Sequence, residues 1–323
     1  MEKIKKITIY LGSKCNLNCA YCHREPDKNE HGITDDLLKL IDDYQPQEIR
    51  FLGGEPTLYM DDIKKVVAHY PRAKFAVTTN GVLLAQHIDY FRKHNFRVTV
   101  SFDGGAENLR GFEPLQQAID YHDFSVSTTL THGNTNFDAI LRSFVAAEKR
   151  IGRLMMFFPH IAHHTNAANE KFALTKDDVK DLLESYREAI YDVWYNYARY
   201  GVINMRYKAI FSQLWIAYNA NYKLGETYCS NGHSLKVDAS GKKFNCSYVR
   251  NTSPEQNRSL VMDKFPECAN CEYYSCCGSA CVQSLSHDIE CAFYKGLYSI
   301  FKHFVANVPP KKLEQLVRCL KCQ

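Results

Sequence analysis

The feature that most constrains the fold is a regular alternation of strand-like and helix-like segments in the first half of the chain. Residues 5–11 and 48–52 are short strand-like segments, and residues 33–44 between them have apolar side chains at helical spacing. The alternation repeats six times at intervals of roughly 25 residues, which is typical of βα units that build a parallel sheet. Eight such units would close a barrel. Six predict an α/β fold with a partial, TIM-like (βα)6 barrel.

The same pattern sets the expected elements. Thr34, followed by Asp35 and Asp36, is expected to cap the first helix. The expected strands are residues 5–11, 48–52, 75–79, 97–102, 125–131 and 154–158. The expected helices are residues 33–44, 61–70, 83–94, 114–121 and 137–149, and helical spacing returns over 175–218. Residues 234–237 and 242–246 predict a hairpin.

The thirteen cysteines are gathered at the two ends of the chain. Three lie within residues 15–22, none within 23–228, and ten within 229–322. The chain starts directly with a strand and shows no signal peptide, so we expect a reducing, cytoplasmic environment, in which clustered cysteines bind metal rather than pair. Cys15, Cys19 and Cys22, spaced C-x3-C-x2-C, fit three corners of an iron–sulfur cluster. The alternatives are a zinc knuckle with a distant fourth ligand or three unrelated thiols.

Composition excludes two classes of function. The residues are 45% hydrophobic and 24% charged, which is ordinary for a globular protein. A net charge of +4 with no dense basic stripe gives no support to nucleic-acid binding. No run approaches the roughly 18 apolar residues of a membrane-spanning helix, so no membrane partner is expected.

The N-terminal motif resembles that of the radical SAM enzymes. Cys15, Cys19 and Cys22 match the family's C-x3-C-x-aromatic-C pattern, with Tyr21 as the aromatic residue beside the cofactor. In that family the motif binds a 4Fe-4S cluster whose open iron is chelated by S-adenosylmethionine (SAM). The resemblance implies reductive cleavage of SAM to a 5′-deoxyadenosyl radical, which abstracts hydrogen from the substrate. It also implies an electron donor such as flavodoxin or ferredoxin.

Three further motifs at the ends of expected strands extend the resemblance. They are Gly53-Gly54-Glu55-Pro56, Thr79-Asn80-Gly81 and Ser101-Phe102-Asp103-Gly104. By resemblance, the first is the loop that binds the methionyl amino group, and Thr79 and Asn80 belong to the same site. Ser101 and Asp103 are expected to reach the ribose hydroxyls or the methionyl carboxylate.

Other interpretations of these motifs stay open. The glycines fit a simple βα turn, Asn-Gly is a common turn, and Ser or Asp at a strand end often caps a helix. Asn134 is a further candidate for SAM binding. His160, His163 and His164 follow the sixth expected strand, where they would either meet substrate or form a solvated loop.

The C-terminal cysteines match the seven-cysteine pattern of the SPASM domain, a module with two auxiliary iron–sulfur clusters. The resemblance implies an outer cluster held by Cys268, Cys271, Cys277 and Cys291, and an inner cluster held by Cys229, Cys246 and Cys281. The chain would thus carry three 4Fe-4S clusters in all. A pair of structural zinc sites is the rival interpretation.

Several thiols and one ligand stay unassigned. Members of the family supply a fourth inner ligand from a cysteine shortly before the position of Cys229, and this chain has none there. The inner cluster would therefore keep an open iron or take another group. Cys276, Cys319 and Cys322 have no assigned role.

The predicted domains are a radical SAM core over 1–170, linking helices over 171–224, a SPASM domain over 225–295, and a C-terminal helix and tail over 296–323. SPASM enzymes mostly act on peptides, so the leading prediction is an oxidoreductase that forms a carbon–carbon or thioether bond in a ribosomally made peptide. Ser247 stands where sulfatase-maturing members place an acid, which disfavours that activity. No leader-binding segment precedes the first strand, so a separate leader-binding protein or direct binding of the peptide is expected.

Two alternatives to this function remain. One is a radical SAM dehydrogenase or epimerase of a small molecule or peptide. The other is a non-enzymatic iron–sulfur electron carrier, which would need the cysteines but no SAM site.

Overall fold

A computed structural model describes residues 4–22, 32–104, 124–227, 234–244, 261 and 263–322. The chain divides into two compact units. Unit 1 comprises Met1–Phe102, Glu107–Ser125 and Cys229–Asn257. Unit 2 comprises Asp103–Ala106, Val126–Tyr228 and Arg258–Gln323. The four domain ranges expected from the sequence follow its motifs, whereas these two units follow compactness. The four ranges therefore stay a prediction.

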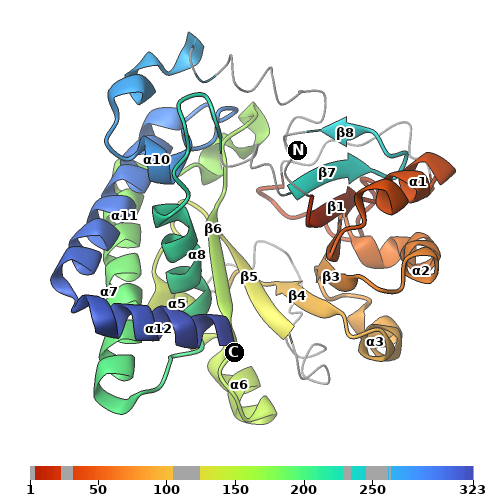
Figure 1. The fold of residues 1–323 in the computed structure, drawn as a ribbon, viewed down its shortest axis with the longest axis horizontal. Helices are drawn as coiled ribbons and strands as arrows, with labels where there is room; N and C mark the ends of the chain where they lie inside the picture. Colours follow the sequence, from red (N-terminus) through yellow and green to blue (C-terminus); the bar gives the residue numbers. More distant parts are fainter. Residues whose placement is uncertain are drawn as a thin grey trace. The chain divides into compact units, whose positions relative to one another are not determined.

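Unit 1 is built on a mostly parallel sheet (Figure 1). Strand β1 pairs in parallel with both β2 and β7, β2 pairs with β3, and β3 with β4, whereas β8 runs antiparallel to β7. The strands are β1 (Lys6–Tyr10), β2 (Glu48–Leu52), β3 (Lys74–Thr79), β4 (Arg97–Ser101), β7 (Ser234–Asp238) and β8 (Lys243–Phe244). Helices α1 (Asp35–Tyr44), α2 (Met60–His69) and α3 (Leu84–Lys93) connect successive parallel strands, as such crossovers require.

Burial explains why these segments are strands. Ile7 and Ile9 of β1 lie opposite Ile49 and Phe51 of β2, and all four side chains are fully buried. The Phe51 ring also stacks on Phe75 of β3 and on Phe96, the residue before β4. The strand ranges predicted for this part of the chain agree with the structure within a residue or two.

The β7–β8 hairpin confirms the predicted turn and has a position that the sequence did not indicate. Strand β7 extends the sheet beyond β1, in register with it. The turn lies against the start of α1, where Thr34 donates from its backbone N–H to Ala239 O (3.1 Å) and from its hydroxyl to Ser240 O (3.0 Å). Thr34 also accepts from Leu37 N–H at 3.4 Å, which confirms it as the cap of α1.

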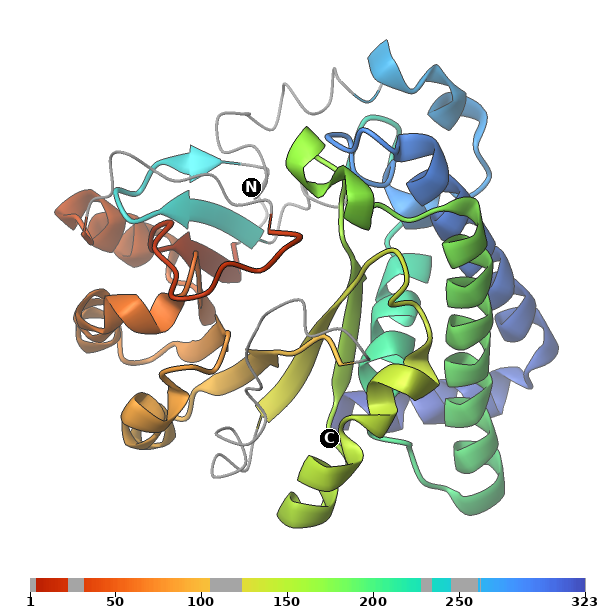
Figure 2. The same ribbon diagram turned by 180° about the vertical axis from the view of Figure 1, so that it is seen from behind.

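Unit 2 combines a parallel strand pair with a helical layer. Most of β5 (Phe124–Leu130) lies in this unit and pairs with β6 (Phe157–Ile161). Helices α7, α8 and α11 lie side by side in both views (Figures 1 and 2). The buried rings of Phe211, Phe301 and Phe304 form an aromatic core between them, with centroids 5.4–5.8 Å apart. The helices are α5 (Phe137–Arg142), α6 (Val145–Ile151), α7 (Lys176–Tyr200), α8 (Lys208–Tyr218), α10 (Tyr274–Cys277), α11 (His287–Asn307) and α12 (Pro310–Cys322), and η2 (Ala167–Phe172) and η4 (Pro266–Asn270) are short 3-10 helices.

Two predicted elements differ from the structure. The single helix expected over 137–149 is divided into α5 and α6 at Ser143. The sixth strand begins at Phe157 rather than at residue 154, because Met155 is held in a buried loop where its N–H donates to the Glu148 carboxylate at 3.0 Å. His160 therefore lies within β6 instead of after it. The helix predicted over 114–121 lies outside the described residues.

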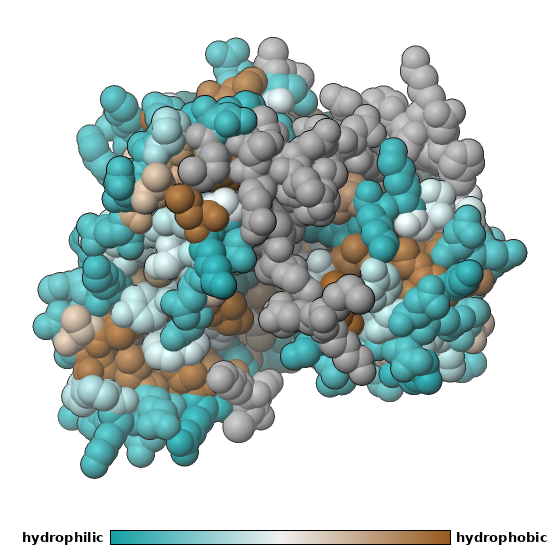
Figure 3. All heavy atoms as spheres, turned by 45° about the horizontal axis from the view of Figure 1, so that its top comes forward, coloured by the Kyte–Doolittle hydropathy of each residue, from teal (hydrophilic) through white to brown (hydrophobic). Residues whose placement is uncertain are grey.

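Hydrophilic side chains cover much of the face seen in Figure 3, and hydrophobic ones form smaller areas between them. Tyr191, Tyr195 and Tyr200 of α7 are among the exposed aromatic residues. None of the described helices combines the length and the apolar character needed to cross a membrane.

Candidate functional site

The three N-terminal cysteines lie on the loop that follows β1. Cys15 and Cys19 are half-buried and Cys22 is exposed, whereas the ring of Tyr21 is buried. The Cys22 N–H donates to Cys19 O at 3.0 Å, so the second half of the loop is a tight turn. Thiol groups on a short, partly exposed turn are accessible to a metal cluster.

Gly53 and Gly54 follow β2 and lie directly against this cysteine loop. The Gly54 N–H donates to Gly12 O and the Glu55 N–H to Lys14 O, both at 2.8 Å. A Cβ on Gly54 would lie 2.2 Å from Lys14 O, and Gly53 has a φ of +153° that side chains rarely adopt. The glycines are therefore required because the two backbone segments approach closely. A simple βα turn would not exclude a side chain at Gly54 in this way.

A Gly54→Ala substitution should displace the cysteine loop. The added methyl group meets backbone oxygen atoms on a segment that carries Cys15, and backbone cannot move aside as a side-chain tip can. We expect a loss of stability of about 2–4 kcal/mol together with weaker retention of iron, measured by thermal unfolding and iron analysis. Gly32→Ala is the matched control, because its Cβ would meet only the tip of Asp62 at 3.2 Å. Equal melting temperatures for the two variants would contradict this account.

Glu55 joins the ends of β2 and β3 through a buried carboxylate. The residue is only 1% exposed, and its Oε1 accepts from Thr57 N–H (3.0 Å) and the Thr57 hydroxyl (2.6 Å). Oε1 also accepts from the Thr79 hydroxyl at 2.7 Å, and Oε2 from Asn80 N–H at 2.7 Å. The carboxylate thus fixes the position of the loop after β3.

Asn80 links that loop to the cysteines. Its side-chain amide donates to Asn16 Oδ1 at 2.7 Å and to Cys15 Sγ at 3.7 Å, and its carbonyl oxygen accepts from Val82 N–H at 3.0 Å. Leu17 N–H donates to the same sulfur at 3.4 Å. These two donors fix the orientation of the Cys15 side chain. In unit 1 the structure therefore brings the cysteine, glycine and Thr79-Asn80 motifs into one neighbourhood.

Three predicted SAM contacts remain. Ser101 is the half-buried last residue of β4 in unit 1. Asp103 and Asn134 lie in unit 2. Asp103 is buried, and its Oδ1 accepts from Thr129 N–H at 3.0 Å. The Asn134 side chain donates to Asp103 O at 3.3 Å. The structure thus places Asp103 and Asn134 together.

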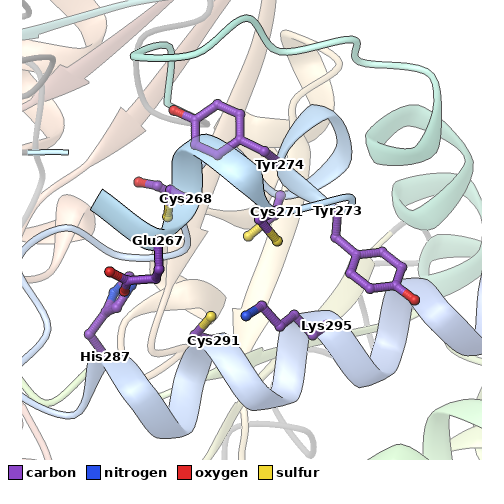
Figure 4. A pocket seen from close by; sticks show the side chains of 10 residues that line it. Glu267, Cys268, Cys271, Tyr273, Tyr274, His287, Cys291 and Lys295 are labelled. Atoms are coloured by element: carbon purple, nitrogen blue, oxygen red, sulfur yellow. The ribbon is translucent and has the colours of Figure 1, made fainter. Parts of the chain in front are cut away.

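Four cysteines of the predicted outer cluster line one pocket in unit 2 (Figure 4). Cys268 comes from η4, Cys271 from the next turn, Cys277 from α10 and Cys291 from α11. Figure 4 shows the thiols of Cys271 and Cys291 in the space between η4 and α11, with the Lys295 ammonium group beside Cys291. Residues separated in sequence thus present their sulfur atoms to one enclosed volume.

The polar groups of this pocket fit an iron–sulfur cluster. Ser279 Oγ and His287 Nε2 are buried and have no hydrogen-bond partner among the described residues, and both residues line the pocket. An unpaired buried polar atom is costly. The sulfide and thiolate sulfurs of a cluster would accept from the Ser279 hydroxyl. His287 Nδ1–H donates to Cys281 O at 3.4 Å, and burial lowers the pKa of His287, so the neutral ring has no proton on Nε2 to donate. The His287 ring is held there by stacking on Phe265 at 3.5 Å between centroids.

Burial raises the pKa of the pocket thiols. The effect takes the pKa of Cys268 to about 11 and that of Cys277 to about 12, with neighbouring thiols adding to it. Below these values each group carries a proton that bound metal must displace, so metal binding in the pocket strengthens as pH rises.

Alkylation measures this protonation state directly. In the metal-free protein at pH 8, Cys277 should react with iodoacetamide about 10³-fold more slowly than an ordinary thiol, because each pKa unit removes tenfold of the reactive thiolate. Exposed Cys319 serves as the internal control, and peptide mass mapping follows both sites. Equal rates at the two thiols would show that the pocket is open and hydrated.

The structure describes some of the remaining cysteines and not others. Cys229 and Cys246 lie outside the described residues. Cys281 is half-buried, near His163 and Glu290. Cys276 donates to Tyr218 O at 3.7 Å, Cys319 is exposed on α12, and the side chain of Cys322 is outside the described set.

Sequence reasoning missed the residues that support the ligands. Tyr59 accepts from Lys14 N–H at 2.8 Å, and its hydroxyl lies against Gly12, so it supports the cysteine loop. Ser279 supplies a hydroxyl donor to the outer pocket, and His287 places an unpaired ring nitrogen in it. His287 could have been predicted from its position in the sequence between Cys281 and Cys291. The sequence around Tyr59 contains no motif that would have identified it.

Comparison with known proteins defines the class. Residues 9–129 match the radical SAM superfamily. A radical SAM domain therefore occupies this N-terminal part of the chain, and the cofactors shared by proteins with this domain are SAM and an iron–sulfur cluster. The match confirms the resemblance drawn from the cysteine motif.

Similarity to particular relatives is lower. The chain is 22% identical to the radical SAM cyclopropyl synthase TigE of Paramaledivibacter caminithermalis, over 95% of this chain and 74% of TigE. It is 35% identical to a probable GTP 3′,8-cyclase of Methanocella arvoryzae, but over only 32% of this chain and 35% of the cyclase.

Solved structures show the same fold. The structure of anSMEcpe with bound AdoMet superposes with a TM-score of 0.68 at 16% identity, covering 94% of this chain and 98% of that one. Streptococcus suis SuiB bound to precursor peptide SuiA gives a TM-score of 0.56 at 17% identity, covering 86% and 72%. These similarities confirm the predicted α/β partial-barrel fold.

Proposed function

We propose that this enzyme uses radical SAM chemistry to oxidise a residue in a peptide, forming a carbon–carbon or thioether bond. The observation that carries the proposal is the pocket formed by Cys268, Cys271, Cys277 and Cys291 in a chain that also has a radical SAM domain. A net oxidation needs an electron acceptor, and a cluster bound in such a pocket would supply one.

The first step is assigned to the N-terminal site. Cys15, Cys19 and Cys22 would hold a cluster that, with SAM bound, supplies the 5′-deoxyadenosyl radical. Asn80 and Leu17 hold the Cys15 sulfur in position by hydrogen bonding to it. Gly53 and Gly54 let their loop lie directly against the cysteine loop, and this loop is assigned to the methionyl amino group of SAM.

The SAM nucleoside is assigned to Asp103 and Asn134, and the methionyl carboxylate to Ser101. The Asp103 carboxylate is oriented by Thr129 N–H and suits hydroxyl donors, such as those of the ribose, better than it suits the negatively charged methionyl carboxylate. Ser101 is the neutral candidate for that carboxylate. Cys268, Cys271, Cys277 and Cys291 would hold the outer auxiliary cluster, and Cys229, Cys246 and Cys281 the inner one.

The comparisons support a peptide substrate. One solved structure of anSMEcpe has a bound Cp18Cys peptide, and SuiB has a bound precursor peptide, in proteins of the same fold. The name of TigE, a cyclopropyl synthase, denotes carbon–carbon bond formation. A leader-binding partner protein and a flavodoxin or ferredoxin donor complete the proposal.

Product mass distinguishes this function from its alternatives. The reconstituted enzyme would be incubated with SAM, dithionite and peptides encoded by short reading frames beside its gene. A peptide lighter by one pair of hydrogen atoms, whose fragmentation shows a covalent link between two residues and which forms with an equal amount of 5′-deoxyadenosine, supports the proposal. The same loss within one residue, without a link, would identify a dehydrogenase. A peptide mass that is unchanged in H₂O but raised by one incorporated deuterium in D₂O would instead identify an epimerase. A reduced protein that forms no 5′-deoxyadenosine at all would be an electron carrier.

A further inference from the structure

Helix α11 presents three different chemical groups to the outer pocket. His287, Cys291 and Lys295 are spaced four residues apart on this helix, so their side chains lie on one face, and all three line the pocket. Figure 4 shows this face turned toward η4, which carries Cys268. The helix thus directs a ring nitrogen, a proposed cluster ligand and a positive charge at the same volume.

The Lys295 ammonium group lies beside the Cys291 sulfur (Figure 4). The two groups interact through their charges and through a side-chain hydrogen bond. Lys295 is exposed and, like Cys291, also lines an open hollow next to the pocket. Its charged end is therefore folded back to a sulfur at the solvent side of the pocket, where an ordinary surface lysine would extend into water.

Two charged side chains act on this sulfur in opposite senses. Because the His287 ring is neutral, Lys295 is the only cation and Glu267 the only carboxylate among the described residues that line the pocket. In the view of Figure 4 the two lie on either side of Cys291. Lys295 favours a negative charge on the Cys291 sulfur and Glu267 opposes it, and the effect of Lys295 is the larger. Of the two charges, Lys295 therefore dominates at this sulfur.

We infer that Lys295 raises the reduction potential of the iron–sulfur cluster that the outer pocket is proposed to hold. Reduction adds one negative charge to a site that already contains four thiolates, and burial opposes that charge. A cation beside one of the four sulfurs stabilises the reduced state more than the oxidised state. Lys295 acts by its charge and is not a ligand. The inference rests on the outer cluster of the proposed function, in which Lys295 would make this cluster a better acceptor for the electron released by substrate oxidation.

A redox titration followed by EPR tests this role without any activity measurement. The sample is the reconstituted chain in which Cys15, Cys19 and Cys22 are all replaced by alanine, so that only auxiliary clusters contribute. The signal that Cys271→Ala removes from this sample belongs to the outer cluster. Lys295→Gln should lower the midpoint potential of that signal while the iron content stays unchanged.

Two further variants separate the charge of Lys295 from its packing. Lys295→Arg keeps the positive charge and should keep the potential near that of the parent sample. Glu267→Gln removes the opposing negative charge and should raise the potential. Shifts in opposite directions at Lys295 and Glu267 follow from charge, whereas a general loosening of the pocket would move the potential of both variants the same way.

Lys302→Gln is the matched control, because it removes the same charge from α11 about two turns further on. The Lys302 ammonium group pairs with Glu272 at 3.0 Å, and Lys302 is not among the described residues that line the pocket. The potential should therefore equal that of the parent sample.

Equal potentials in Lys295→Gln and Lys302→Gln, or an equal fall in Lys295→Arg and Lys295→Gln, would overturn the role of the Lys295 charge alone. A parent sample with no signal that depends on Cys271, or with zinc in place of iron, would overturn the outer cluster of the proposed function as well.

Discussion

Replacing Cys15, Cys19 and Cys22 together by alanine is expected to abolish the formation of 5′-deoxyadenosine from SAM. The variant should also lose about four of roughly twelve irons per chain, because each 4Fe-4S cluster holds four. The fold should survive, since the cysteine loop is half-exposed and its thiols contribute no core packing. Iron analysis, circular dichroism and chromatographic detection of 5′-deoxyadenosine measure the three effects.

Cys276→Ala is the matched control for this variant. Cys276 lies next to a proposed cluster ligand but donates its thiol proton to Tyr218 O. It should retain all the iron and the full rate of SAM cleavage. The assignment of the N-terminal cluster would be wrong if the triple variant kept its iron content, or if it cleaved SAM at the rate of the parent enzyme.

Glu55→Ala is expected to destabilise unit 1 by about 3 kcal/mol or more, because it leaves buried donors of Thr57, Thr79 and Asn80 without an acceptor. Glu55→Gln should lose less, since one amide oxygen remains to accept. Guanidinium unfolding measures both variants. Because the carboxylate also positions Asn80, both should weaken the retention of the N-terminal cluster.

Glu314→Ala provides the baseline for that experiment. Glu314 is an exposed residue of α12 that forms an ion pair with Arg318, one turn away. Its removal should change stability by less than about 0.5 kcal/mol. If Glu55→Ala behaved like Glu314→Ala, the buried carboxylate would not be the link between the ends of β2 and β3.

Local signals in the sequence were sufficient for the fold class and the first motif. The cap at Thr34, the strands of unit 1 and the cysteine triplet are each defined by neighbouring residues, and the structure and comparisons agree with them. The four thiols of the outer pocket could be grouped because their spacing matches a known pattern. Whether they bind a cluster stays a prediction.

Long-range contacts account for what the sequence did not indicate. Thr79 lies 24 residues from the Glu55 carboxylate that it binds, and Glu290 lies 127 residues from His163. The hairpin strand β7 pairs with β1 from more than two hundred residues away. None of these partners can be found by periodicity, since their proximity follows from the assembled sheet and helices rather than from spacing.

The most direct measurement is the fate of SAM on the reduced, anaerobically reconstituted wild-type protein. If the N-terminal loop holds a cluster with one iron open to SAM, dithionite should convert SAM to methionine and 5′-deoxyadenosine in equal amounts. Intact SAM after reduction of a fully iron-loaded protein, or zinc in place of iron at the N-terminal cysteines, would contradict the radical chemistry from which the proposed function follows.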